Sequence, residues 1–119
     1  MKILKCHCGQ IEAEINIKNI EKILRCNCSI CKRKGAIMSM VKNEDFKIVK
    51  GKQKLKIYKF HSKIAQHFFC SDCGIYTHHN PRSNPSMTGF NIGCVDEVDV
   101  FGFKEVPLND GKNHPLDKQ

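Results

Sequence analysis

The spacing of apolar and polar residues predicts that the chain is built mainly from short β-strands. Residues 10–17 place isoleucine or alanine at every second position, which is typical of a half-buried strand. Residues 36–41 are almost entirely apolar and predict a strand buried on both faces. Residues 46–49 and 55–60 flank a turn at Gly51 and predict a β-hairpin. The fold class expected from the first half is therefore all-β and mainly antiparallel.

The second half of the chain continues this pattern. Residues 67–70 predict a strand that enters a tight turn, and residues 73–78 leave it. Residues 90–95 predict a further strand that carries Cys94, and the turn-rich chain beyond Asp96 is expected to wrap the surface. There is no repeat, linker or long amphipathic helix in the sequence, so we expect a single domain over residues 1–119.

The length and composition bear on the cellular compartment of the protein and on the state of its thiols. No run of about 18 apolar residues is present, so we expect no membrane span. The five residues before Cys6 are too few for the apolar part of a signal peptide. We therefore expect a cytoplasmic protein, in which reductants keep thiols free. Eight cysteines in that setting indicate metal binding, with disulfides as the alternative.

Seven of the eight cysteines fall into three tight groups, and this arithmetic predicts two zinc sites per chain. A structural zinc takes four protein ligands, whereas a catalytic zinc takes three and keeps one position open. The two pairs together make one closed site, and the triplet C-x-C-x-x-C makes an open one. The groups are Cys6 and Cys8; Cys26, Cys28 and Cys31; Cys70 and Cys73. A competing partition completes the triplet with Cys94, which would make both sites structural.

Four histidines could also enter a metal shell. His7 lies between the first two cysteines and is expected to point away from the ion. His78 and His79 are adjacent on a predicted strand, so they should face opposite sides, and at most one can reach a given site. His67 precedes the third cysteine group and is a further candidate.

The chain is basic, with a formal net charge of +8. Seven thiolates and two zinc ions would change this by −7 + 4 = −3, to about +5. Lysines crowd the predicted hairpin at positions 50, 52, 54, 56 and 59. We interpret them as a solvated edge that resists aggregation, with Tyr58 and Phe60 facing the core. The alternative is a non-catalytic zinc module that binds nucleic acid or an acidic partner through this hairpin.

A zinc ion held by three thiolates has a limited chemistry. It can hold an incoming thiol as thiolate or polarise a carbonyl oxygen. Both fit the addition of a thiol to a small aldehyde, or the reverse cleavage of a carbon–sulfur bond. A redox or metal-buffering protein is a third reading.

The motifs, taken in order, resemble those of the glutathione-dependent formaldehyde-activating enzyme family, which includes centromere protein V. They are C-H-C-G-x-I from Cys6, C-N-C-S-I-C from Cys26, H-F-F-C-S-D-C-G-I-Y from His67, and N-I-G-C-V-D from Asn91. The resemblance covers nearly the whole chain and implies a zinc-stabilised β-tent fold of twisted antiparallel sheets.

The same resemblance implies a role for each cysteine group. The first and third groups match the family's structural zinc ligands, and Cys26, Cys28 and Cys31 match its catalytic zinc ligands. The implied activity is that of a carbon–sulfur lyase, which condenses formaldehyde with glutathione to S-(hydroxymethyl)glutathione. The implied partner is a small-molecule thiol such as glutathione, rather than a membrane or a nucleic acid.

Overall fold

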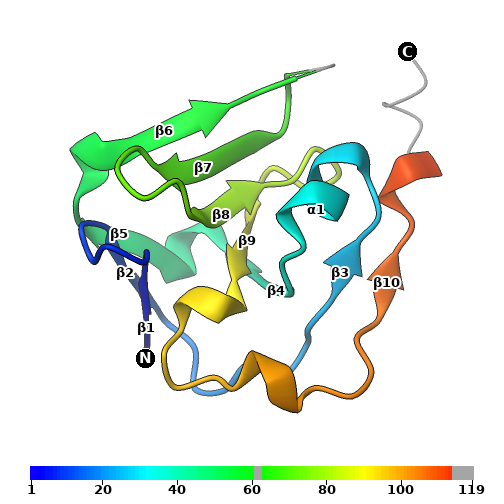
Figure 1. Cartoon of the computed structure of the whole chain (residues 1–119), viewed down its shortest axis with the longest axis horizontal. Helices are drawn as coiled ribbons and strands as arrows, with labels where there is room; N and C mark the ends of the chain where they lie inside the picture. The colour runs from blue at the N-terminus through cyan, green and yellow to red at the C-terminus, as the bar shows by residue number, and fades with distance from the viewer. Residues whose placement is uncertain (61–62, 114–119) are drawn as a thin grey trace.

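The computed structural model describes residues 1–60 and 63–113, and in this part the chain is mostly antiparallel β-sheet, as predicted (Figure 1). The largest sheet has five antiparallel strands in the order β4-β9-β8-β7-β6. Its strands are β4 (Met38–Lys42), β6 (Leu55–Tyr58), β7 (Gln66–Cys70), β8 (Tyr76–Asn80) and β9 (Met87–Asn91). Strands β4 and β6 are therefore its two edges.

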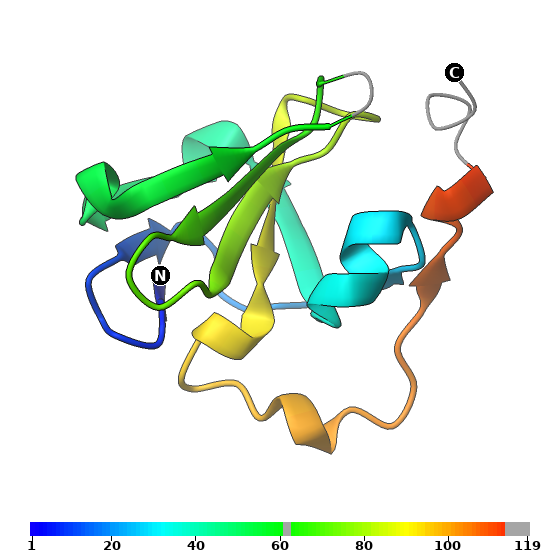
Figure 2. The same ribbon diagram turned by 45° about the horizontal axis from the view of Figure 1, so that its top comes forward.

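A second, antiparallel sheet has the order β1-β2-β5, and a short parallel pair joins β3 to β10. These strands are β1 (Lys2–Lys5), β2 (Glu12–Ile15), β3 (Arg25–Cys26), β5 (Phe46–Lys50) and β10 (Leu108–Asn109). The α-helix α1 (Ser29–Lys34) has six residues and lies beside the β3-β10 pair (Figure 2). Five short 3-10 turns complete the secondary structure: η1 (Asn43–Asp45), η2 (Lys52–Lys54), η3 (Ile92–Cys94), η4 (Val100–Gly102) and η5 (Gly111–Asn113).

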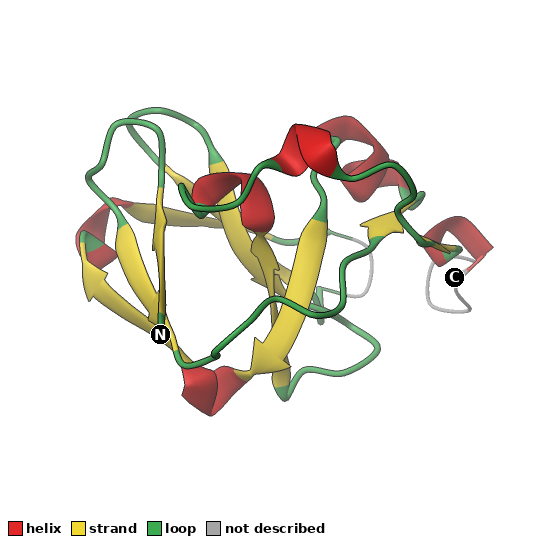
Figure 3. Ribbon diagram, turned by 90° about the horizontal axis from the view of Figure 1, so that it is seen from below, coloured by secondary structure: helices red, strands yellow, loops and turns green. Residues whose placement is uncertain are grey.

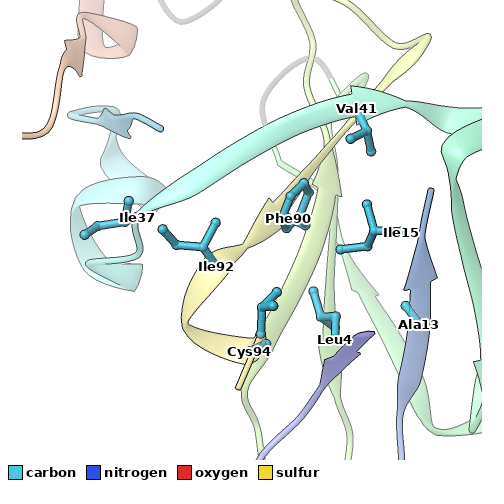
Figure 4. Packing of buried hydrophobic residues seen from close by; sticks show 9 residues of the cluster. Leu4, Ala13, Ile15, Ile37, Val41, Phe90, Ile92 and Cys94 are labelled. Atoms are coloured by element: carbon cyan, nitrogen blue, oxygen red, sulfur yellow. The ribbon is translucent and has the colours of Figure 1, made fainter. Parts of the chain in front are cut away.

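The main core lies where the inner faces of the two large sheets meet (Figure 4). Ala13 and Ile15 of β2 are fully buried, which confirms the alternation read from residues 10–17. They pack with Leu4 of β1 and with Val41 and Phe90 of the five-stranded sheet. Each fully buried aliphatic or aromatic side chain contributes about 1.5–3 kcal/mol. This core holds the two sheets together, and the cysteine groups belong to two smaller, separate clusters.

The predicted hairpin around Gly51 is wrong. Strand β5 pairs with β2, whereas β6 pairs with β7, so the two segments belong to different sheets. The turn itself is present: Gly51 has a φ of 79°, and a Cβ there would overlap the carbonyl of Gln10. Glycine is thus required where the chain crosses from one sheet to the other.

Two further expectations need correction. Residues 92–94 form the turn η3, so Cys94 does not lie on a strand, although β9 ends just before it. Tyr58 does not face the core: 52% of it is exposed, because it lies on the edge strand β6.

The chain after η3 is nearly free of regular structure until it reaches β10, and it runs around one side of the molecule, as predicted (Figure 3). Its valines at 98, 100 and 106 pack against the core, while Phe101 is almost fully exposed. In the described part of the chain, no helix is long and apolar enough to cross a membrane.

Candidate metal centres and the adjoining cavity

The first candidate metal centre joins two turns that are far apart in sequence. The sulfur atoms of Cys6, Cys8, Cys70 and Cys73 all lie within 4.8 Å of one another. Cys6 and Cys8 occupy the turn between β1 and β2, while Cys70 ends β7 and Cys73 lies in the turn that follows it. Both turns need glycine, since Gly9 and Gly74 have positive φ.

The geometry of this group fits a tetrahedral zinc. The Sγ atom of Cys8 lies 3.6 Å from that of Cys6 and 3.7 Å from that of Cys70. Zinc–sulfur bonds of about 2.3 Å at tetrahedral angles place sulfurs about 3.8 Å apart. The amides of Ile11 and Asp72 donate to Cys6 Sγ and Cys70 Sγ at 3.3 and 3.4 Å, which stabilises thiolates. The four residues can therefore hold an ion as a closed site.

The second group consists of Cys26, Cys28 and Cys31, whose sulfurs also lie within 4.8 Å of one another. Cys26 ends β3, and Cys28 is the N-cap of α1, where its Sγ accepts from the amide of Cys31 at 3.4 Å. Gly35, in the left-handed conformation, ends this helix by donating to the carbonyl of Cys31. The end of β3 and the start of α1 thus bring the three sulfurs together, although the sequence pattern did not predict a helix.

The three thiols compete for protons. Hydrogen bonds from the Cys28 and Cys31 thiols lower the pKa of Cys26, and the hydrogen bond to Cys26 raises the pKa of Cys31. Three sulfurs held this close together favour a bound cation, because the ion replaces thiol protons.

Among residues 1–60 and 63–113, no fourth histidine, cysteine or carboxylate completes this group. Cys94 lies in the main core cluster, and its Sγ is 3.6 Å from the carbonyl oxygen of Tyr76. His7 is exposed and belongs to neither sulfur group. All eight cysteines are free, so the alternative of disulfide bonds is not what the structure holds.

A cavity of about 350 Å³ opens beside the second group, and all three of its cysteines line it. Its wall also includes Ala65, His67, His79, Arg82 and Gly111. A volume of this size accommodates a small organic ligand. The sulfur triplet therefore faces a space that a substrate can enter, whereas the first group lies at turns outside it.

The adjacent histidines face opposite sides of the sheet, as predicted. His79 lines the cavity, and its Nδ1 lies 2.6 Å from the Tyr76 hydroxyl. His78 instead stacks on Phe68 with centroids 4.3 Å apart and also contacts Phe46. Burial lowers the pKa of each ring to about 3, so both are neutral at pH 7.

His67 is held by a lysine that the sequence analysis overlooked. Lys34 Nζ lies 2.8 Å from His67 Nδ1 and 3.6 Å from the centroid of the Tyr76 ring. Burial lowers the pKa of Lys34 to about 8. The same effect lowers the pKa of His67 to about 4. Lys34 lies three residues after Cys31, on the same side of α1, and this spacing was the available signal.

The C-terminal segment is the other contribution that sequence reasoning missed. Asn109 Nδ2 lies 3.7 Å from Cys26 Sγ, and Asn27 pairs with Asp110 at 3.1 Å. The carbonyl of Gly111 accepts from Arg82 Nη2 at 3.0 Å. The segment predicted only to wrap the surface therefore forms one wall of the cavity.

The lysine-rich stretch is divided by the fold. Lys54 pairs with Asp72 at 3.2 Å, and Lys50 donates to the carbonyl of Gly9 at 3.2 Å. Lys52 and Lys56 are exposed near the β6 edge. These lysines thus do not form one continuous basic surface. The exposed ones lie near an edge strand, where charge discourages pairing with another chain.

The model of the family described as "Glutathione-dependent formaldehyde-activating enzyme" matches residues 1–106. This range contains every cysteine of both sulfur groups. A crystal structure of a Rhodobacter sphaeroides protein is 40% identical to the chain, with a TM-score of 0.86. The match covers 90% of this chain and 99% of that chain.

Proposed function

Because the chain belongs to the glutathione-dependent formaldehyde-activating enzyme family, we propose that it is a zinc-dependent carbon–sulfur lyase acting on a thiol–aldehyde adduct. The substrate pair that the family suggests is glutathione and formaldehyde, and the adduct is S-(hydroxymethyl)glutathione. In the forward direction RSH + H₂C=O gives RSCH₂OH. A carbon–sulfur bond forms, the carbonyl π pair moves to oxygen, and oxygen takes up the proton that the thiol releases.

The observation that carries this proposal is the unequal division of the sulfurs. Four thiols surround one point at the turns, and three line a cavity without a fourth ligand among the described residues. We assign Cys6, Cys8, Cys70 and Cys73 to a structural zinc, and Cys26, Cys28 and Cys31 to a catalytic zinc. The latter ion, when bound, supplies Lewis acidity and holds a substrate thiol as thiolate.

The residues around the triplet prepare the cavity for an anionic thiol. Three thiolates and one Zn²⁺ leave a net charge of −1, and the partly buried ammonium of Lys34 lies close enough for its pKa to respond to all three sulfurs. Arg82 contributes a second cation to the cavity wall. These charges offset the thiolates and favour a ligand that carries carboxylates. The reaction also requires reduced thiols, which supports a cytoplasmic setting.

The test is the rate of adduct formation with purified, zinc-loaded protein against the rate in buffer alone. We expect an acceleration that Cys28→Ser abolishes, because that variant loses a ligand of the open site. Cys94→Ala is the matched control, since its thiol lies in the core and in neither sulfur group. If no low-molecular thiol reacts faster with the protein than in buffer, the proposed function is wrong.

A further inference from the structure

The two histidines that line the cavity form one hydrogen-bonded unit with Tyr76 and Lys34. His67 and His79 face each other across β7 and β8, and their rings stack at 5.6 Å with an angle of 10° between the planes. Lys34 binds Nδ1 of the first ring, and Tyr76 binds Nδ1 of the second. The Lys34 ammonium also makes a cation–π contact with the Tyr76 ring, so the two partners of the histidines contact each other as well.

The partners determine which ring nitrogen carries the proton. A lysine ammonium has three donors and no acceptor, so His67 Nδ1 must accept. With a pKa of about 8, Lys34 is mostly protonated at pH 7. A neutral imidazole that accepts at Nδ1 carries its hydrogen on Nε2.

The ring of His79 is fixed in the same way, by the hydroxyl of Tyr76. Burial raises the pKa of Tyr76, so its hydroxyl keeps its proton. In the described chain, His79 Nδ1 is the one hydrogen-bond partner of this hydroxyl, so the phenol donates and Nδ1 accepts. His79 therefore also carries its hydrogen on Nε2.

The backbone of β9 packs closely against the imidazole ring of His79. A Cβ at Gly89 would overlap Cε1 and Nδ1 of His79 and the sulfur of Met40. The glycine on β9 thus lets the imidazole lie directly against the neighbouring strand. In the described residues nothing accepts from Nε2 of either ring, although both rings are part of the cavity wall.

We propose that His67 and His79 present two Nε2–H donors to the oxygen of the aldehyde, or of the hydroxymethyl group that it becomes. This inference rests on the proposed function and deepens it. As the thiolate adds to the carbonyl carbon, negative charge develops on that oxygen. Two neutral donors held in place beforehand stabilise the charge without reorganising. They transfer no proton, and the oxygen is protonated by the proton that the thiol released.

In this arrangement Tyr76 and Lys34 are positioning residues. They do not touch the reacting atoms but hold each ring in the tautomer whose N–H is directed to the ligand. The structure assigns them this role because each binds the Nδ1 atom and leaves Nε2 as the remaining polar atom. Loss of either partner should change the tautomer before it changes the fold.

The first measurement uses the tautomers themselves. Long-range ¹⁵N–¹H spectra of the zinc-loaded protein should show both rings as neutral Nε2–H tautomers at pH 6–7. Addition of glutathione and formaldehyde should shift both Nε2–H signals, with exposed His7 as the internal reference. Tyr76→Phe should remove the preference at His79 alone. An Nδ1–H tautomer in the unaltered protein overturns the inference.

The second measurement separates kcat from KM. His79→Phe keeps a stacking ring but removes the donor, and we expect kcat to fall by roughly 10²-fold, or to the buffer rate, with KM for the thiol little changed. Zinc content per chain should stay the same. His78→Phe is the control, because this neighbouring ring stacks on Phe68 and does not line the cavity.

The outcomes distinguish the two levels of the proposal. If the unaltered protein does not accelerate adduct formation, the proposed function is wrong, and the role proposed for the histidines is wrong with it. If it accelerates the reaction and His79→Phe keeps its kcat, the function stands and the donor pair is refuted.

Discussion

Gly111 lies directly against Cys26, so that a Cβ on this glycine would overlap the cysteine Sγ and contact Cys28 as well. The two residues are far apart in sequence, and the parallel pairing of β10 with β3 brings them together. Hydrogen bonds reinforce this contact, since the amide of Asn27 donates to the carbonyl of Asn109 and the amide of Lys112 to the side chain of Asn27. The sulfur triplet is thus closed on one side by backbone rather than by a fourth ligand.

Replacing Gly111 with alanine should therefore weaken metal binding at the second group and leave the first intact. The added methyl must displace either the C-terminal segment or Cys26, since the overlap is with a sulfur that the ion needs. We expect zinc to leave Gly111→Ala at a lower chelator concentration than it leaves the unaltered protein, by roughly tenfold. The measurement is zinc release followed with a chromogenic chelator. Gly102→Ala, at the end of η4, is the control, and equal release from both variants would contradict this expectation.

Local patterns in the sequence were sufficient where one segment decides its own structure. The alternation at residues 10–17, the two cysteine turns and the opposite orientation of His78 and His79 depend on backbone geometry within a few residues. All were predicted correctly. The sulfur partition could also be reached, because four ligands and three ligands are different kinds of zinc site.

Long-range pairing was not predictable in the same way. Residues 46–50 and 55–58 look like a hairpin because both are strands around a glycine, yet the first pairs with β2 and the second with β7, in different sheets. Lys34 and Tyr76 were also overlooked. The contact of Lys34 with His67 joins α1 to β7, and the spacing after Cys31 gave no sign of that partner. The contact of Tyr76 with His79 lies within β8, where simple alternation would place residues three apart on opposite faces.

The two sulfur groups should respond differently to loss of one thiol. Cys28→Ser should lower the zinc content from two ions per chain to one with the fold kept, since the main core does not depend on the triplet. Cys73→Ser should unfold the protein or greatly destabilise it, because its site joins the β1–β2 turn to the β7–β8 turn and binding energy there is folding energy. Metal analysis and far-UV circular dichroism measure both effects. A folded Cys73→Ser protein with one zinc would reverse the assignment of the sites.

The buried ring of His78 should make the protein sensitive to acid. Burial lowers the pKa of this ring to about 3, whereas in the unfolded chain the ordinary value is about 6.5. The unfolded state therefore binds the proton first, so stability is retained above pH 6.5 and lost as the pH falls toward 3. Between pH 7 and 5 the loss from this one ring is about 2 kcal/mol.

His78→Phe should remove that part of the pH dependence, because phenylalanine can stack on Phe68 without titrating. Urea unfolding at pH 7 and at pH 5 gives the comparison. The ring faces away from the cavity, so zinc loss affects both proteins equally and cancels in the difference. If the variant loses as much stability as the unaltered protein over this range, His78 is not held neutral by burial.

Reversing the charge of two exposed lysines on and beside β6 should leave the rate of the lyase reaction unchanged. Lys52 and Lys56 are exposed and do not line the cavity, so the double variant Lys52→Glu with Lys56→Glu keeps the sulfur groups and the cavity wall. Lys54 is left in place because it pairs with Asp72 next to the first sulfur group.

For duplex DNA we expect only the weak, salt-dependent affinity of any basic surface, with a dissociation constant of about 10⁻⁴–10⁻⁶ M at physiological salt. The variant should reduce the slope of log K against log salt by roughly 2, because two phosphate contacts are lost. A binding titration at several salt concentrations, run beside the kinetic assay, separates the two readings. Submicromolar binding that the double variant abolishes, in a protein without measurable acceleration, would mean that this surface and not the cavity carries the function.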